Sequence, residues 1–176
     1  TYLIGLRKSI QNRGPIVGPP GVAGWYNNDM YFKGANMLMT IREVVHDDAR
    51  WRRLLRGLNH TFWHRTVTGA EVQQYMSHAA GLDLDPLFRQ YLATTDIPAL
   101  EYRLEPGLLA YRWTQVVPGF AMPVRVTIPG LGPRLLHPTA TWRTLRLPRS
   151  AATRLDVDPR FYVTARPVAA SADSTR

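Results

Sequence analysis

Apolar residues recur every three or four positions in several segments before Pro98, which predicts a succession of amphipathic helices. One predicted helix begins at Asn28 or Asp29, either of which can cap it, and continues to Val45. It is apolar on two sides, which is typical of a helix buried in a larger body. Its apolar rows are Gly34, Leu38, Ile41 and Val45, and Met30, Met37 and Val44. Because glycine in a helix interior costs about 1 kcal/mol relative to alanine, we expect another backbone to pass close to Gly34.

A second helix is predicted from Asp47 or Asp48, where a clean apolar stripe begins. The stripe consists of Trp51, Leu54, Leu55, Leu58 and Phe62. Arginines fill the other side, and we interpret them as a solvated helix face. They are Arg50, Arg52, Arg53 and Arg56.

Two more helices have clear boundary signals. Thr68 and Glu71 match a capping box at the start of the third helix, and Gly81 supplies the left-handed residue that ends it. Asp85 can cap the fourth helix, and Pro86 suits its first position. The inward-facing residues are expected to be Val72, Tyr75, Met76 and Ala79, and then Leu87, Phe88, Tyr91 and Leu92.

After Pro98 the apolar period changes to two, which predicts strands. The alternating runs are 100–104, 108–117, 122–128, 139–147 and 161–168. Short strands separated by Gly- and Pro-containing turns favour a small antiparallel β-sandwich. The sequence therefore predicts an α+β chain, with a helical part at 1–97, a β-sandwich at 98–168 and a disordered tail at 169–176.

A segment rich in Gly and Pro, residues 12–21, leads into the helix that begins near Asp29. Such a segment ends any helix and forms a loop. Loops held by rigid elements commonly carry function, so Gly14 and Pro15 are candidate cleft-lining residues. A plain connector is an equally good interpretation.

Within the predicted helix that begins near Asp29, residues 31–42 read Tyr-x-Lys-Gly-Ala followed by Leu-x-x-x-Arg. This pattern resembles a motif of the membrane alanine aminopeptidase family, the gluzincin zinc metallopeptidases. Segments 81–84 and 87–98 resemble the same family in the same order, with Tyr91 in place of its usual tryptophan and Leu87 in place of an aromatic residue. The resemblance covers about residues 1–147. It implies that the helical part is the C-terminal half of a thermolysin-like catalytic domain and that a β-sandwich follows.

The resemblance also implies a role for Tyr31. In that family the matching tyrosine donates a hydrogen bond to the tetrahedral intermediate of peptide hydrolysis, and a phenol is a neutral donor at pH 7. Residue type alone favours a different interpretation, in which Tyr31 is a buried core aromatic. Lys33 is a candidate cleft residue or a partner for an upstream carboxylate, and an ordinary charged side chain is an equal alternative.

The zinc ligands, the general base and the amine-binding motif of that family lie upstream of its tyrosine, and none is among the thirty residues before Tyr31. The chain also begins at Thr1 without a signal peptide, which predicts a processed product or an excised piece. We therefore expect zinc only in a longer parent enzyme, with this chain metal-free and inactive alone. Its expected partners are a peptide substrate and the missing N-terminal part of the parent.

His60 and His64 have the i, i+4 spacing of a zinc-binding helix face. Thr61 stands where a His-Glu-x-x-His peptidase motif has its glutamate, so it cannot serve as the general base. We therefore do not assign this pair as the catalytic metal site.

Composition adds three limits. There are no cysteines, so disulfides and thiolate zinc sites are excluded. No apolar run is long enough to span a membrane. The net charge is +9, with 20 Arg and 2 Lys, but the arginines are scattered and no RNA-binding motif accompanies them.

Two alternatives to an active peptidase remain at this level: an inactive relative that serves as a binding or scaffold module, and a less favoured basic module that binds nucleic acid. The compartment is not determined.

Overall fold

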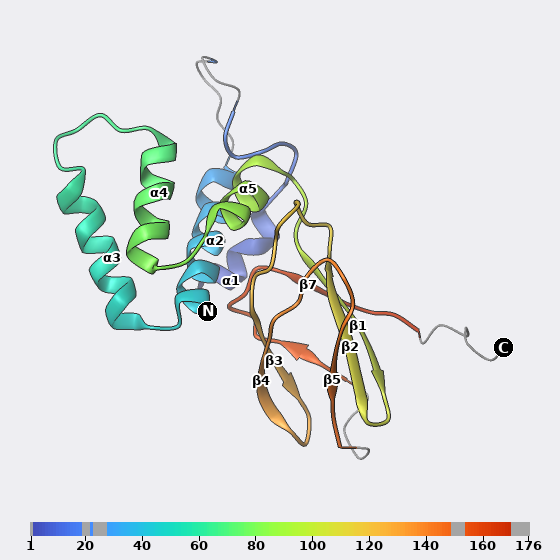
Figure 1. The fold of residues 1–176 in the computed structure, drawn as a ribbon. Coiled ribbons are helices and arrows are strands. Elements are labelled where there is room, and N and C mark those ends of the chain that lie inside the picture. Colours follow the sequence, from blue (N-terminus) through green and yellow to red (C-terminus); the bar gives the residue numbers. More distant parts are fainter. Residues whose placement is uncertain (1, 19–21, 23–27, 149–153, 170–176) are drawn as a thin grey trace. The chain divides into compact units, whose positions relative to one another are not determined.

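The computed structural model describes residues 2–18, 22, 28–148 and 154–169 of the chain (Figure 1). The chain divides into two compact units, Thr1–Asp96 and Ile97–Arg176. The first unit is helical and the second is built from strands, which confirms the predicted α+β class. The predicted tail lies outside the described residues from position 170 onward. In the described residues, no helix is both long and apolar enough to cross a lipid bilayer.

The helical unit consists of a short N-terminal helical segment and four longer helices. They are α1 (Tyr2–Gly5), the 3-10 turn η1 (Leu6–Ser9), α2 (Asp29–Val45), α3 (Asp48–Thr61), α4 (Gly69–Ala80) and α5 (Asp85–Ala93). Several predicted boundaries are confirmed. Asp47 caps α3 by accepting the backbone N–H of Arg50 at 2.9 Å, and Thr68 and Glu71 form a complete capping box on α4. Gly81 ends α4 with φ of 64°.

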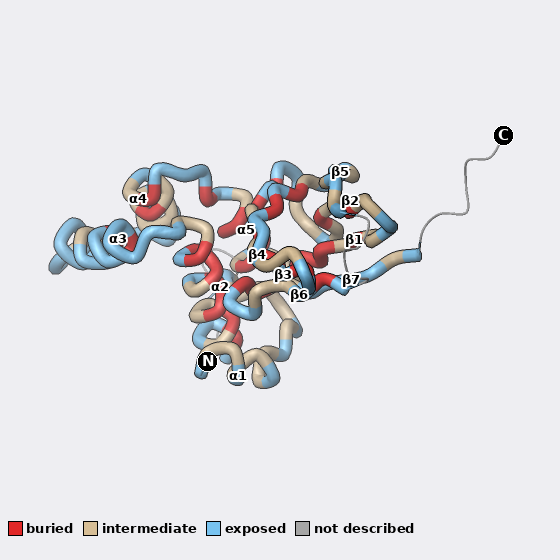
Figure 2. The backbone as a smooth tube through the Cα atoms, turned by 90° about the horizontal axis from the view of Figure 1, so that it is seen from below, coloured by how far each residue is buried: buried red, intermediate tan, exposed pale blue. Residues whose placement is uncertain are grey.

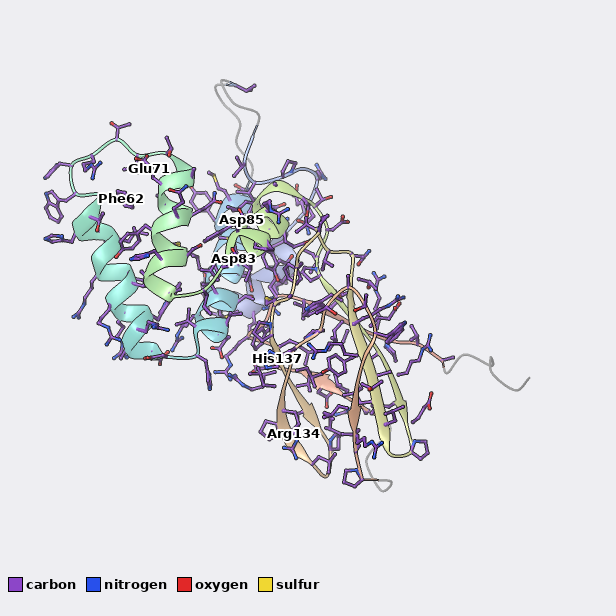
Figure 3. All side chains as sticks on the ribbon, viewed as in Figure 1. Phe62, Glu71, Asp83, Asp85, Arg134 and His137 are labelled. Atoms are coloured by element: carbon purple, nitrogen blue, oxygen red, sulfur yellow. The ribbon has the colours of Figure 1, made fainter. Side chains whose placement is uncertain are left out.

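Two predicted caps are wrong. Asn28 precedes α2 but its side chain makes no capping hydrogen bond, and the carboxylate of Asp29 turns instead to the N-terminal loop. At α5 the residue before the helix is Leu84, so Asp85 is already helical. Just before the helix, the carboxylate of Asp83 accepts the backbone N–H of Asp85 at 3.0 Å. Both residues are labelled in Figure 3.

Figure 2 shows buried positions along α2. Most of them are polar, contrary to the two apolar rows that we predicted. Leu38 and Met30 are exposed, although Met37 and Ile41 are buried as expected. The buried polar residues are Asp29, Lys33, Asn36, Thr40 and Glu43. The predicted close approach at Gly34 is also wrong, because a Cβ added there would meet no heavy atom within 4 Å in the described part of the chain.

The second unit contains two sheets. Their strands are β1 (Ala99–Glu105), β2 (Leu108–Thr114), β3 (Val124–Ile128), β4 (Gly132–Leu136), β5 (Arg143–Arg146), β6 (Asp156–Val157) and β7 (Thr164–Pro167). The strand order is β5-β2-β1-β7 in one sheet and β4-β3-β6 in the other. The strands pair antiparallel as expected, with the exception of β1 and β7, which run parallel.

Buried aromatic and branched residues form the core of this unit. Trp113 is buried on β2, where its ring meets Phe120 edge to face with centroids 5.7 Å apart. Its indole N–H is satisfied by the carbonyl of Met122 at 2.9 Å. Alternate residues of β3 are buried, as expected for a strand with one face against a core.

Candidate functional site

Tyr31 lies in the first turn of α2, and the residue is 61% exposed. Its backbone N–H donates to the carbonyl of Asn28 at 3.1 Å, within the turn that starts the helix. The neighbouring Met30 is exposed as well. An exposed tyrosine on a regular helical turn is not the core aromatic that its residue type alone suggests. Tyr31 therefore belongs to the surface of this unit.

Lys33 lies half a turn further along α2 and is fully buried. Its ammonium donates to the backbone carbonyl of Thr94, the residue after α5, at 2.7 Å. Burial lowers the pKa of Lys33, while the negative charges of Asp29 and Asp96 act in the opposite direction. This bond ties the first turns of α2 to the end of α5, because a buried ammonium requires a good acceptor.

Asp29 fixes the same turn to the N-terminal loop. Its two carboxylate oxygens accept the backbone N–H groups of Gln11 and Asn12, at 2.9 and 2.6 Å. Charge-assisted bonds of this kind are stronger than neutral ones. The loop is tied again further on, where the N–H of Val17 donates to the carbonyl of Leu92 at 3.1 Å.

Asn36 continues the buried polar row one turn beyond Lys33. Its side-chain oxygen accepts from Nε of Arg7 at 2.7 Å, and its amide donates to the carbonyl of Leu3 at 3.1 Å. The N-terminal segment is therefore also held by α2. We did not predict this row, although the sequence carries a signal for it: Asp29, Lys33, Asn36 and Thr40 repeat at helical spacing, as apolar core residues do.

Two cleft-lining candidates predicted from the sequence remain. Gly14 and Pro15 are half-buried in the loop between the two anchors at Asn12 and Val17. Their cleft-lining roles, and that of Lys33, stay predictions. The Lys33 amine is already bonded within the protein, so in this unit it acts on the position of α2.

The described residues do not form a metal site. Within them, no three His, Cys, Asp or Glu side chains gather closely enough to hold a metal ion. His60 is in the last turn of α3, but the helix ends at Thr61 and His64 has a left-handed φ of 52°. The two imidazoles therefore do not share a helix face.

Comparison with known proteins gives one informative result. No protein-family profile matches the chain, and no curated protein matches it by sequence. Among solved structures, the chain is similar to a crystal structure of Legionella pneumophila aminopeptidase A in complex with aspartic acid, with a TM-score of 0.67 and 14% sequence identity. The match covers 97% of this chain but only 22% of that protein. At this identity the likeness shows an aminopeptidase-like fold and nothing finer.

Proposed function

We propose that this chain is part of a zinc-dependent aminopeptidase, in which Tyr31 stabilises the oxyanion formed when a peptide bond is attacked. The observation that carries the proposal is the exposure of the Tyr31 side chain on a turn whose opposite side is buried and bonded. The motif around Tyr31 and the aminopeptidase-like fold support it.

A hydrogen-bond donor stabilises a developing negative charge best when it is held in place before the reaction. Asp29 and Lys33 hold the turn from two directions, one toward the N-terminal loop and one toward the end of α5. The Tyr31 side chain extends from the exposed side of the same turn. In this proposal Tyr31 is the catalytic residue of the chain, and Asp29 and Lys33 are positioning residues.

The other parts of the reaction come from outside this chain. The zinc ligands, the general base and the site for the substrate's amino group belong, in this proposal, to the missing N-terminal part of the parent. When bound, zinc would activate a water molecule for attack on the peptide carbonyl. The substrate is then a peptide with a free N-terminus.

The test is Tyr31→Phe in the intact protein that contains this chain. We expect kcat on aminoacyl substrates to fall about 100- to 1,000-fold, the usual effect of removing one oxyanion donor. The zinc content should be unchanged, because Tyr31 is not a ligand. An intact protein that contains no zinc and hydrolyses no aminoacyl substrate would instead be the inactive relative, and the proposal would fail.

A further inference from the structure

All four arginines of α3 are exposed. Three of them lie together on one side by helical spacing, and we name them the arginine ridge: Arg52, Arg53 and Arg56. The opposite side of the helix is buried at Trp51 and Leu54. Figure 2 shows α3 exposed along most of its length. The helical spacing therefore separates a packed side from a cationic side.

The arginine ridge lacks the partners that other helical arginines have. Arg42 pairs with Asp48 at 2.9 Å and Arg89 pairs with Asp85 at 2.8 Å. Among the described residues, no side chain of the ridge forms an ion pair or a hydrogen bond. Asp47, the residue before α3, has its pKa lowered first by the N–H of Arg50, and only to a smaller extent by the charge of Arg53.

This charge pattern is unfavourable for the isolated helix. Arg52 and Arg56 are four residues apart, where like charges face each other and repel. The only acidic residue within α3 is Asp48, at its first position, where it already pairs with Arg42. A partner that carries negative charge would remove the repulsion.

Exposed apolar side chains accompany the ridge. Leu55 is 38% exposed and lies three residues after Arg52, on the same surface of the helix. Trp63, two residues beyond the end of α3, is 69% exposed, and its ring meets that of His64 edge to face at 5.2 Å. Arginines on a helix that carries an exposed leucine and is followed by an exposed tryptophan are typical of surfaces that meet the headgroup region of a bilayer.

We propose that the arginine ridge, with Leu55 and Trp63, docks on the surface of an anionic phospholipid bilayer. Guanidinium groups bind phosphate by paired hydrogen bonds. Because no hydrogen bond among the described residues fixes the three ridge side chains, they are not arranged for one rigid partner. A fluid layer of headgroups can adapt to them.

Nucleic acid also presents phosphates, but the apolar residues favour lipid. Single-stranded nucleic acids are usually bound in a basic groove or on a platform with several stacked aromatic rings. The ridge is the convex side of one helix, and the one Phe, Tyr or Trp residue within α3 is Trp51, which is buried on the other side. Leu55 would gain little from a phosphate backbone, whereas a bilayer interface accepts it.

The test is co-sedimentation of the full 176-residue chain with vesicles of phosphatidylcholine that contain about one-third phosphatidylserine. We expect binding at low salt, release near 1 M salt, and no binding to pure phosphatidylcholine. Each basic residue near an anionic surface changes the partition about fivefold, so Arg52→Gln/Arg53→Gln/Arg56→Gln should reduce it about 100-fold. Trp63→Ala should reduce it as well.

A matched control distinguishes an effect of the ridge from an effect of net charge alone. Arg134→Gln/Arg146→Gln/Arg166→Gln removes three exposed arginines from the other unit and changes the net charge equally. This variant should bind vesicles almost as the unchanged chain does. Equal losses in both triple variants would overturn the proposal, as would a failure to bind anionic vesicles at low salt. Ridge-dependent binding to duplex DNA, without binding to vesicles, would assign the surface to nucleic acid instead.

Discussion

The ammonium of Lys33 donates to the backbone carbonyl of Thr94 at 2.7 Å, and the Lys33 side chain is completely buried. The two residues are 61 positions apart in sequence, so this bond joins the start of α2 to the end of the helical unit. It lies on the far side of the turn that presents Tyr31. A single buried cation thus fixes the place from which the phenol extends.

Lys33→Ala should destabilise the 176-residue chain by about 3 kcal/mol. The substitution leaves a cavity and also leaves the Thr94 carbonyl without its donor. Urea unfolding followed by circular dichroism measures the change. The matched control is Lys8→Ala, which replaces the chain's other lysine, an exposed one, and should change the free energy of unfolding by less than about 0.5 kcal/mol. Equal effects of the two substitutions would contradict the role given to Lys33.

Replacing each of two helical glycines by alanine should change the free energy of unfolding in opposite directions. A Cβ at Gly57 on α3 would collide with the hydroxyl of Tyr75, so Gly57→Ala should cost about 1–3 kcal/mol. A Cβ at Gly34 on α2 meets nothing in the described part of the chain, so Gly34→Ala should stabilise the chain by about 1 kcal/mol through helix propensity. The melting temperatures of the two variants give the comparison. Adding Tyr75→Phe to Gly57→Ala should recover much of the lost stability, because it removes the hydroxyl that the new Cβ meets. Destabilisation by Gly34→Ala would show instead that another group packs against α2 at Gly34.

The β unit should lose stability at acidic pH because Asp158 becomes protonated. Burial acts to raise its pKa, but hydrogen bonds from Arg160 and Arg125 outweigh this effect and lower the pKa from 3.8 to about 2. A carboxylate with a lower pKa in the folded chain contributes stability above its ordinary value, and this contribution is lost as the pH falls from about 4 toward 2. At neutral pH, Asp158→Asn should therefore cost about 2 kcal/mol.

The free energy of unfolding as a function of pH measures this contribution. The control is Asp156→Asn, because Asp156 is exposed and pairs with the exposed Arg154 at 2.8 Å. We expect the difference between Asp158→Asn and the unchanged chain to shrink to less than about 0.5 kcal/mol near pH 2. The Asp156 variant should behave almost normally throughout. A difference that persists unchanged at pH 2 would rule out the carboxylate as its source.

The helices and most strands could be predicted from sequence because their signals are local. The apolar stripe of α3, the capping box of α4 and the alternation in β3 each lie within a few residues. Strands β4 and β6 were missed for physical reasons. β4 contains Pro133 and successive exposed positions, as an edge strand allows, and β6 has only two residues.

The polar row on α2 could not be predicted from its own residues. Whether a lysine at position 33 is solvated or buried depends on the carbonyl of Thr94, which only the folded chain brings near. In the same way, Asp29 takes its partners from Gln11 and Asn12 rather than from its own helix. The position of Tyr31 at the start of a helix followed from local signals, but its proposed role came from a motif, since residue type alone favoured a buried aromatic.

The most direct test of the proposed function compares two tyrosines in the intact protein. Tyr31→Phe and the control Tyr2→Phe each remove one hydroxyl from an exposed tyrosine of the helical unit. We expect kcat to fall about 100- to 1,000-fold in the Tyr31 variant alone, with KM little changed, because the lost hydrogen bond forms only as the oxyanion develops. Equal kcat values for the two variants and the unchanged enzyme would contradict the assignment of Tyr31 as its oxyanion donor.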